Sequence, residues 1–281
     1  MTVTLTPSTQ TAPTERRRSL VPHRRLTRPA PLLELAILGL GYTAYELTRV
    51  AVAGSTRSAM IDGRRIYRLE QLLHLSPERW LNGVLSVRPG LAHIAGYYYT
   101  TLHFVVTLAV LAWLYWRHPG NYRTMRTALV AATLPSLLAF WLFPAAPPRF
   151  AIPHLSDTLD DLHIAGVLAP RASAGMANLY AAMPSLHVAW AAWCALSIWA
   201  VFRREHRYLA LLPWTYPIAT ALVVISTANH YFLDAPAGLL ALALGVWVAV
   251  QREHLVGLSY RAGRWLGQPM VQVGKAMAGE R

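Results

Sequence analysis

The chain is poor in cysteine and in charged side chains, and these two shortages exclude several classes of protein. Its 281 residues include one cysteine, Cys194, so an intrachain disulfide is excluded and a multi-cysteine metal site is not expected. Charged residues make up 14% of the chain, which is less than soluble proteins of this size usually have. The sequence also contains no nucleotide-binding loop, Cys/His metal pattern, EF-hand or internal repeat.

Long hydrophobic runs dominate what is present. Hydrophobic residues make up 54% of the chain. They are gathered in blocks close to the roughly 20 residues of helix that cross a ~30 Å bilayer core. The blocks predict an all-α, polytopic membrane protein in which six transmembrane helices form a bundle. The predicted spans are residues 31–53, 91–116, 124–143, 184–202, 208–227 and 232–250.

The rest of the sequence divides into tails and loops by composition. Residues 1–30 are rich in Thr, Ser, Pro and Arg, which predicts a disordered cytoplasmic N-terminal tail. Residues 31–250 form the predicted membrane domain, which would hold any catalytic site, and residues 251–281 form a cytoplasmic C-terminal tail. Residues 144–183 are a long outer loop, which we expect to cap a site because loops of this length are usually functional or disordered.

Residues 62–87, between the first and second spans, have a different pattern. Apolar side chains recur there at helical spacing on either side of Pro77, and Arg64, Glu70 and Glu78 are among the charged residues at the other positions. The pattern predicts two amphipathic helices that lie in the membrane interface. They could form a lid or a ramp for lipid access, or they could serve only as a packing strut.

The formal net charge is +13, and the arginines that produce it lie in the gaps between the hydrophobic runs. With the N-terminus in the cytoplasm, most of the 26 lysines and arginines fall on the inner side, as the positive-inside rule requires. This distribution predicts cytoplasmic N- and C-termini and contact with the anionic headgroups of the lipid bilayer. It argues against nucleic acid as a partner, since the basic residues do not form one stripe.

Two short polar motifs stand at the edges of hydrophobic runs. One is Pro184-Ser185-Leu186-His187, and the other is His230-Tyr231-Phe232-Leu233-Asp234. Histidines beside lipid are costly unless they face a polar cavity or a partner. The predicted topology brings both motifs, and Arg149 beyond the third span, to one extracytoplasmic level, so we expect them to form one site.

Each of five residues in these segments suits a step of phosphoryl transfer. Ser185 precedes an apolar helix and would stand near its N-cap, beside backbone N–H groups that bind anions. His187, in the first turn, could act as an acid toward a leaving oxygen. If the sixth helix begins one residue before His230, Asp234 shares a helix face with it, and could hold one ring nitrogen while the other attacks phosphorus. Arg149 would hold phosphate oxygens with its guanidinium group.

Taken singly, each of these residues is more often structural than catalytic. Their predicted convergence favours one shared site, in which His187, His230 and Asp234 are catalytic and Ser185 and Arg149 bind phosphate, with no metal. Weaker candidates are other polar residues of the outer side, namely His93, His103, His154, Asp157, Asp160, Asp161, His163, Arg171 and Tyr180.

Three segments resemble the type 2 phosphatidic acid phosphatase superfamily. They are Phe143-Pro144-Ala145-Ala146-Pro147-Pro148-Arg149, Ala182-Met183-Pro184-Ser185-Leu186-His187 and Asn229-His230-Tyr231-Phe232-Leu233-Asp234, and the resemblance covers about residues 31–250. Within the superfamily they are most similar to the branch that contains fungal inositol phosphorylceramide synthase and its actinobacterial relatives.

The resemblance implies a six-helix membrane enzyme that uses neither a metal nor another cofactor. The residue matching His230 attacks the phosphate of a membrane lipid and becomes phosphorylated, and Asp234 orients it. The residue matching His187 protonates the leaving alcohol, and water or an acceptor alcohol then takes the phosphoryl or phosphodiester group.

The sequence departs from the phosphatase branch at three positions. Leu142 stands where that branch has a lysine, Val224 stands where it has an arginine, and Leu186 replaces the glycine of Pro-Ser-Gly-His. The loss of two cationic phosphate ligands favours a phosphodiester substrate, and therefore headgroup transfer, over hydrolysis of a dianionic monoester. Arg171 or Arg88 could substitute for the missing cations.

Alternative functions stay open at this stage. The chain could be a lipid phosphate phosphatase, a lipid transporter or scramblase, or a catalytically inactive lipid-binding member of the superfamily. Against transport, the ionisable residues gather at one end of the spans and not at their centres. We expect a multi-pass protein of the plasma membrane with an extracytoplasmic active site, and a homo-oligomer is compatible with this interpretation. The sequence leaves the lipid open among phosphatidylinositol, phosphatidate, polyprenyl phosphates and sugar-linked polyprenyl phosphates.

Overall fold

The computed structural model describes residues 28–52, 56–161 and 180–277, and over these ranges it is mainly helical and contains no β-strand. The predicted helical class is therefore confirmed for this part of the chain. The α-helices are α1 (Pro31–Val52), α2 (Thr56–Leu72), α3 (Glu78–Ser86), α4 (Pro89–Tyr97), α5 (His103–Arg117), α6 (Pro119–Leu142), α7 (Pro148–Ala151), α8 (Thr158–Asp161), α10 (Leu186–Phe202), α11 (Thr215–Ser226) and α12 (Asp234–Met277). A π-helical segment, η1 (Tyr98–Leu102), joins α4 to α5, and a 3₁₀ segment, η2 (Leu209–Trp214), leads into α11.

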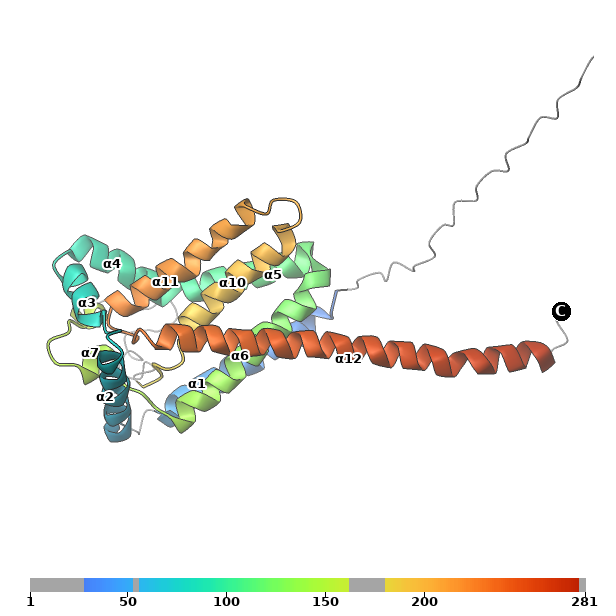
Figure 1. Cartoon of the computed structure of the whole chain (residues 1–281), viewed down its shortest axis with the longest axis horizontal. Helices are drawn as coiled ribbons and strands as arrows, with labels where there is room; N and C mark the ends of the chain where they lie inside the picture. Colours follow the sequence, from blue (N-terminus) through green and yellow to red (C-terminus); the bar gives the residue numbers. More distant parts are fainter. Residues whose placement is uncertain (1–27, 53–55, 162–179, 278–281) are drawn as a thin grey trace, which may run out of the picture.

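The centre of the bundle is α10, which packs against α5, α6, α11 and α12 (Figure 1). Its sequence is apolar all round, as expected for a helix with neighbours on every side. Ala189, Ala191 and Trp193 are completely buried, and the Trp193 indole N–H donates to the backbone oxygen of Met125 at 2.8 Å. The helix that carries His187 is therefore fixed by packing from all sides.

Four helical stretches of the described chain are long and apolar enough to cross a membrane: Pro89–Arg117, Pro119–Leu142, Leu209–Ser226 and Asp234–Val256. They correspond to four of the six predicted spans. The other two predicted spans are helical as well, but α10 has 17 residues, fewer than a usual span, and α1 is not among the four stretches. Six spans are therefore not confirmed. The predicted end of the last span at residue 250 falls inside α12, which continues to Met277 and extends beyond the bundle (Figure 1).

The helix α1 packs along α6, and a buried acidic residue joins the two. Glu34 accepts a hydrogen bond from the Tyr122 hydroxyl at 2.7 Å and forms an ion pair with Arg126 at 2.6 Å. A carboxylate in an apolar run is tolerated when it is paired and hydrogen-bonded in this way. Glu34 is therefore part of the contact between α1 and α6.

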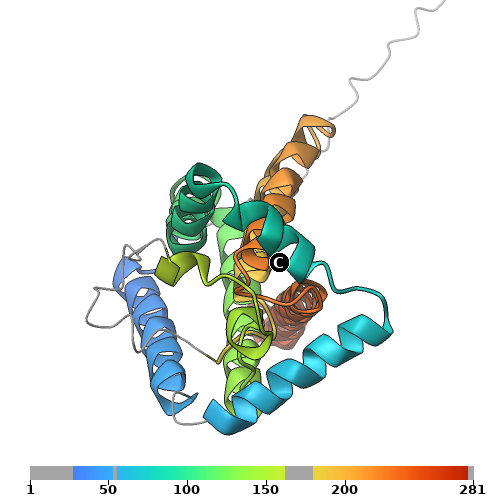
Figure 2. The ribbon, with the colours of Figure 1, turned by 90° about the vertical axis from the view of Figure 1, so that its left-hand side faces the viewer.

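One end of the bundle is closed by short elements. The helix α2 lies across this end, at a large angle to α6 and α12, and α3 and α7 lie close to it (Figures 1 and 2). Ala145 and Ala181 form a parallel bridge, with Ala145 N–H donating to Tyr180 O at 2.8 Å. This bridge holds the segment before Arg149 beside the segment before Ser185, so that the two predicted motifs enter the same region.

The two helices of residues 62–87 expose apolar side chains and bury two acidic ones. Their exposed side chains include Leu69, Leu72 and Trp80, whereas Glu70 and Glu78 are completely buried. The buried stripe of α2 is made by small and polar residues as well as one isoleucine: Ala59, Asp62, Gly63, Ile66 and Glu70. Glu70 and Glu78 occupy non-apolar positions of the sequence pattern, yet they are buried because their carboxyl groups bind backbone N–H groups inside the protein.

The helices α6 and α12 approach closely at Gly245. A Cβ atom there would overlap the carbonyl oxygen of Ala128 and would lie 2.8 Å from the backbone nitrogen of Ala132. We expect Gly245→Ala to lower the free energy of unfolding by about 1–3 kcal/mol, because overpacking forces the helices apart. Gly41→Ala on α1 is the matched control, since no atom lies within 4 Å of its Cβ position. Thermal unfolding in detergent micelles measures the difference, and equal midpoints for the two variants would contradict the packing argument.

Candidate active site

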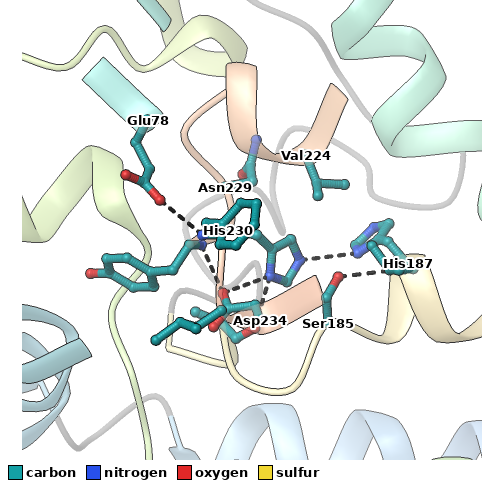
Figure 3. A network of polar contacts seen from close by, with 12 residues as sticks. Glu78, Ser185, His187, Val224, Asn229, His230 and Asp234 are labelled. Atoms are coloured by element: carbon teal, nitrogen blue, oxygen red, sulfur yellow. Dashed lines mark hydrogen bonds and ion pairs between the residues drawn. The ribbon is translucent and has the colours of Figure 1, made fainter. Parts of the chain in front are cut away.

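His230 lies in a short non-helical stretch just before α12. The predicted span that begins at residue 232 agrees closely with α12, which begins at Asp234, so His230 and Asp234 do not share a helix face. The two side chains nevertheless meet, with His230 Nδ1 at 3.1 Å from Asp234 Oδ2 and at 2.8 Å from the carbonyl oxygen of Ala182 (Figure 3). A carbonyl oxygen can only accept, so Nδ1 must carry a proton. In the neutral ring this leaves the lone pair on Nε2.

His187 faces that lone pair. Its Nδ1 is 3.3 Å from His230 Nε2, so Nδ1 of His187 is the donor in this contact (Figure 3). The His187 ring stacks on Tyr99 with a centroid distance of 4.5 Å and lies 4.2 Å from the ring of His103. Tyr99 belongs to the π-helical segment η1, and His103 is the residue directly after that segment. Single π-helical turns are frequent at functional sites. These two aromatic rings fix the orientation of the imidazole.

Ser185 stands at the N-cap of α10. Its hydroxyl accepts from Val188 N–H at 3.4 Å, and its own N–H donates to the backbone oxygen of Asp234 at 3.0 Å. A Cβ at Gly238 would overlap the Ser185 carbonyl oxygen, so α12 can lie this close only because residue 238 is a glycine. Ser185 is completely buried and does not line the cleft described below, so it joins the starts of α10 and α12.

Arg149 lies at the start of α7 on the other side of the histidines. Its guanidinium group donates to Asn229 Oδ1, and its Nε lies 3.1 Å from Asp157 Oδ2. The same group packs over the ring of Phe150, 4.5 Å from the centroid. These contacts hold the charge in a fixed orientation beside His230.

A narrow cleft of about 60 Å³ opens onto these groups. Arg149, His187, His230 and Asn229 are its convergent polar groups, and most of the remaining wall is apolar or aromatic. The lining residues are Tyr45, Tyr99, Phe140, Pro147, Arg149, Ala181, Ala182, Leu186, His187, Asn229 and His230. The arrangement places two histidines in contact and one cation beside them.

The positions that depart from the phosphatase branch offer no cation. Leu142 is 66% exposed at the end of α6, and Val224 is buried in an apolar cluster with Val188 and Ile225. The backbone oxygen of Val224 accepts from the N–H groups of residues 229 and 230 at 3.1 and 3.0 Å. Leu186 lines the cleft and packs against Phe140.

Six of the nine weaker candidates divide into three groups. Asp157 contacts Arg149, and His103 contacts His187, so both lie at the site. His93 is exposed and bonded to its own helix, and Tyr180 donates its hydroxyl hydrogen bond to Thr56. His163 and Arg171 lie outside the described residues. Arg88, which lies between α3 and α4, donates to the backbone oxygen of Val84 at 2.7 Å.

Sequence reasoning missed the role of Glu70 and Glu78. Glu70 Oε1 accepts from Leu233 N–H at 2.7 Å, and Glu78 Oε1 accepts from Phe232 N–H at 2.8 Å. A signal was present in α2, where Glu70 follows Ile66 by four residues on a stripe that also contains small residues. That stripe is the buried one, since only small side chains allow the close approach of another chain segment.

The apolar helices and the paired histidines together define a helical membrane protein with a candidate phosphoryl-transfer site. A comparison with family models matches residues 64–248 to the PAP2 superfamily. The chain belongs to this superfamily, whose members are phosphatases or phosphotransferases, and it is a membrane enzyme of the phosphoesterase type. Comparisons with curated proteins and with solved structures found no match. The resemblance noted in the sequence is thus confirmed for the superfamily, while the synthase-like branch stays a prediction.

Proposed function

We propose that this protein transfers a phosphate-containing headgroup from a membrane lipid to an alcohol acceptor through a phosphohistidine at His230. The observation that carries the proposal is the contact of His230 Nε2 with His187 Nδ1 at 3.3 Å, in a cleft that also contains Arg149. A nucleophile whose other nitrogen is held by a carboxylate, beside a donor for the leaving oxygen, is what phosphoryl transfer needs.

In the first step, His230 Nε2 attacks phosphorus and the bond from phosphorus to the lipid alcohol breaks. His187 enters this step as the imidazolium, and the leaving oxygen takes the proton of its Nδ1, which leaves a neutral ring with its proton on Nε2. Asp234 stabilises the positive charge that develops on the His230 ring, since it already accepts from Nδ1. Arg149 binds the non-bridging oxygens of the phosphate, for which it exchanges part of its contact with Asp157 and Asn229.

In the second step, His187 has become a base and takes the proton of the incoming hydroxyl. That oxygen attacks phosphorus, and the bond to His230 breaks. Transfer is favoured over hydrolysis because Arg149 is the one arginine or lysine among the described residues that line the cleft. A single cation suits a phosphodiester with one negative charge better than a dianionic monoester.

The proposed donor carries an inositol-phosphate-like headgroup, in line with the synthase-like motifs. The proposed location is the extracytoplasmic face of the cell membrane, with both termini in the cytoplasm. This follows from the distribution of arginines, most of which flank the ends of the spans opposite to the cleft. The positive-inside rule assigns those ends to the cytoplasm, and the cleft therefore to the other side. Membrane lipids would reach the cleft laterally, and no nucleic acid takes part.

One prediction of the proposed function concerns the nucleophile, His230. Purified protein in detergent, given phospholipids or polyprenyl phosphates with and without inositol-type acceptors, should form a new headgroup-bearing lipid only when an acceptor is present. His230→Ala should lower kcat by about 10³-fold or more, as expected for loss of a nucleophile. His93→Ala is the matched control, because His93 is an exposed histidine bonded to its own helix.

Other outcomes of this assay identify other functions. Release of free phosphate without acceptor-dependent product would make the protein a lipid phosphatase. Lipid movement across vesicle membranes that persists in His230→Ala, without phosphoryl chemistry in the wild type, would support a transporter or scramblase and refute the enzyme.

Another prediction concerns the cation, Arg149. Arg149→Lys keeps the charge but loses the fixed fork, so kcat/KM should fall by about 10- to 100-fold, the range for a hydrogen bond to a charged group. Arg88→Lys should have no such effect, since Arg88 is exposed, lies between α3 and α4, and donates to the backbone oxygen of Val84. Steady-state kinetics with the donor identified above measures both, and equal values for the two variants would remove Arg149 from phosphate binding.

A further inference from the structure

Three consecutive backbone N–H groups next to His230 each donate to a different carboxyl group. They belong to residues 231–233. The acceptors are Asp234 Oδ2 for residue 231, Glu78 Oε1 for residue 232 and Glu70 Oε1 for residue 233, at 2.9, 2.8 and 2.7 Å. Asp234 Oδ2 is also the atom that contacts the Nδ1 of His230 (Figure 3). The main chain beside the proposed nucleophile is therefore held by three acids.

This stretch needs acceptors from elsewhere because it is not helical. The helix α12 begins at Asp234, so residues 231–233 have no intrahelical partners for their N–H groups. Buried N–H groups without a partner are costly. Glu70 and Glu78 come from α2 and α3, more than 150 positions away along the chain, and they supply two of the missing partners.

The burial of the three acids restricts their charge. Glu70, Glu78 and Asp234 are completely buried, and the carboxyl groups of Glu70 and Glu78 share a side-chain hydrogen bond. Neighbouring carboxyl groups that are removed from water do not all ionise. Burial, and then the charge of Glu78, raises the pKa of Glu70 from 4.5 to about 9, and burial also raises the pKa of Glu78.

We propose that Glu70 and Glu78 are positioning residues for His230, and that they act as a buried pair of one carboxylic acid and one carboxylate. The pair fixes the backbone between His230 and Asp234, so that the imidazole keeps its alignment with His187. This inference rests on the function proposed above. Both glutamates act through the main chain and do not touch the substrate, so they are distinct from the catalytic residues.

Variants that remove or keep the acceptor oxygen distinguish a positioning role of Glu70 and Glu78 from a purely structural one. Glu70→Ala and Glu78→Ala each leave an N–H group without a partner, and kcat should fall by about 10- to 100-fold, as for a misplacement of about 1 Å, with KM nearly unchanged. Glu70→Gln should rescue most of this loss, because the amide oxygen still accepts from Leu233 and a proton-bearing acid is replaced by a neutral group. Gln71→Ala, an exposed neighbour on α2, is the matched control and should keep wild-type kinetics.

A pH series tests the protonation of the pair and does not depend on catalysis. The groups that face Glu70 are Glu78 from α3, Asp234 from α12 and Tyr231 from the connecting stretch, while Arg64 of α2 acts on Tyr231. Burial, followed by the charge of Asp234, raises the pKa of Tyr231, so this hydroxyl stays neutral through the range tested.

The direction in which the thermal midpoint changes with pH follows from proton binding. Folded protein holds the Glu70 proton up to about pH 9, whereas the unfolded chain releases it near pH 4.5, so the thermal midpoint should decline as pH rises between these values. Glu70→Gln should remove this part of the decline. Glu78→Gln should move the upper end of the decline to lower pH, because it removes the neighbouring charge that raises the Glu70 pKa.

Either the kinetics of the variants or the pH series can overturn the inference. Wild-type kcat in both alanine variants, or a Glu70→Gln protein with the same pH dependence of its thermal midpoint as the wild type, would do so. If the alanine variants fail to fold, the glutamine variants and the pH series decide alone. A wild type without phosphoryl transfer but with the predicted pH series would refute the proposed function and leave the acid–carboxylate pair standing.

Discussion

The architecture of the candidate site depends on one constraint, which is that the non-helical residues 229–233 must have their backbone polar groups satisfied inside the protein. The Val224 carbonyl accepts from the first two N–H groups, and Asp234, Glu78 and Glu70 accept from the next three. A carbonyl and three carboxyl groups from four elements of the chain thus define the path of five residues. Because His230 lies in this stretch, its ring position is set by the same hydrogen bonds, and any element that supplies an acceptor influences the candidate site.

The second histidine is fixed by a different kind of force. His187 is in the first turn of α10, which is buried on all sides by apolar packing, and Tyr99 and His103 cover its ring. One histidine is therefore positioned by hydrogen bonds and the other by close packing, and they meet at 3.3 Å. A contact between two such rigid parts suits a reaction in which phosphorus must be placed between nucleophile and acid.

The charge of the cleft is as informative as its histidines. Membership in the PAP2 superfamily makes the protein a membrane enzyme of the phosphoesterase type, and the proposal of headgroup transfer goes further on the basis of what surrounds the phosphate position. Val224 packs in an apolar cluster, Leu142 is exposed, and Arg149 is already held by Asp157 and Asn229. A site with this much apolar wall and one fixed cation among its described lining residues matches a lipid phosphodiester.

Hydrophobic length and local motifs determined much of this protein from sequence alone. Four apolar helices, the Ser185 N-cap and the convergence of His187, His230, Asp234 and Arg149 follow from features within short windows, because span length and helix termini are local properties. The carboxyl acceptors of residues 231–233 and the burial of Glu70 and Glu78 do not. In the sequence, both glutamates look like the polar face of an amphipathic helix, and their acceptor role exists only when α2 and α3 meet residues 232 and 233. Tertiary structure alone decided these features, since the free energy of burying a carboxyl group depends on a partner that is distant in the chain.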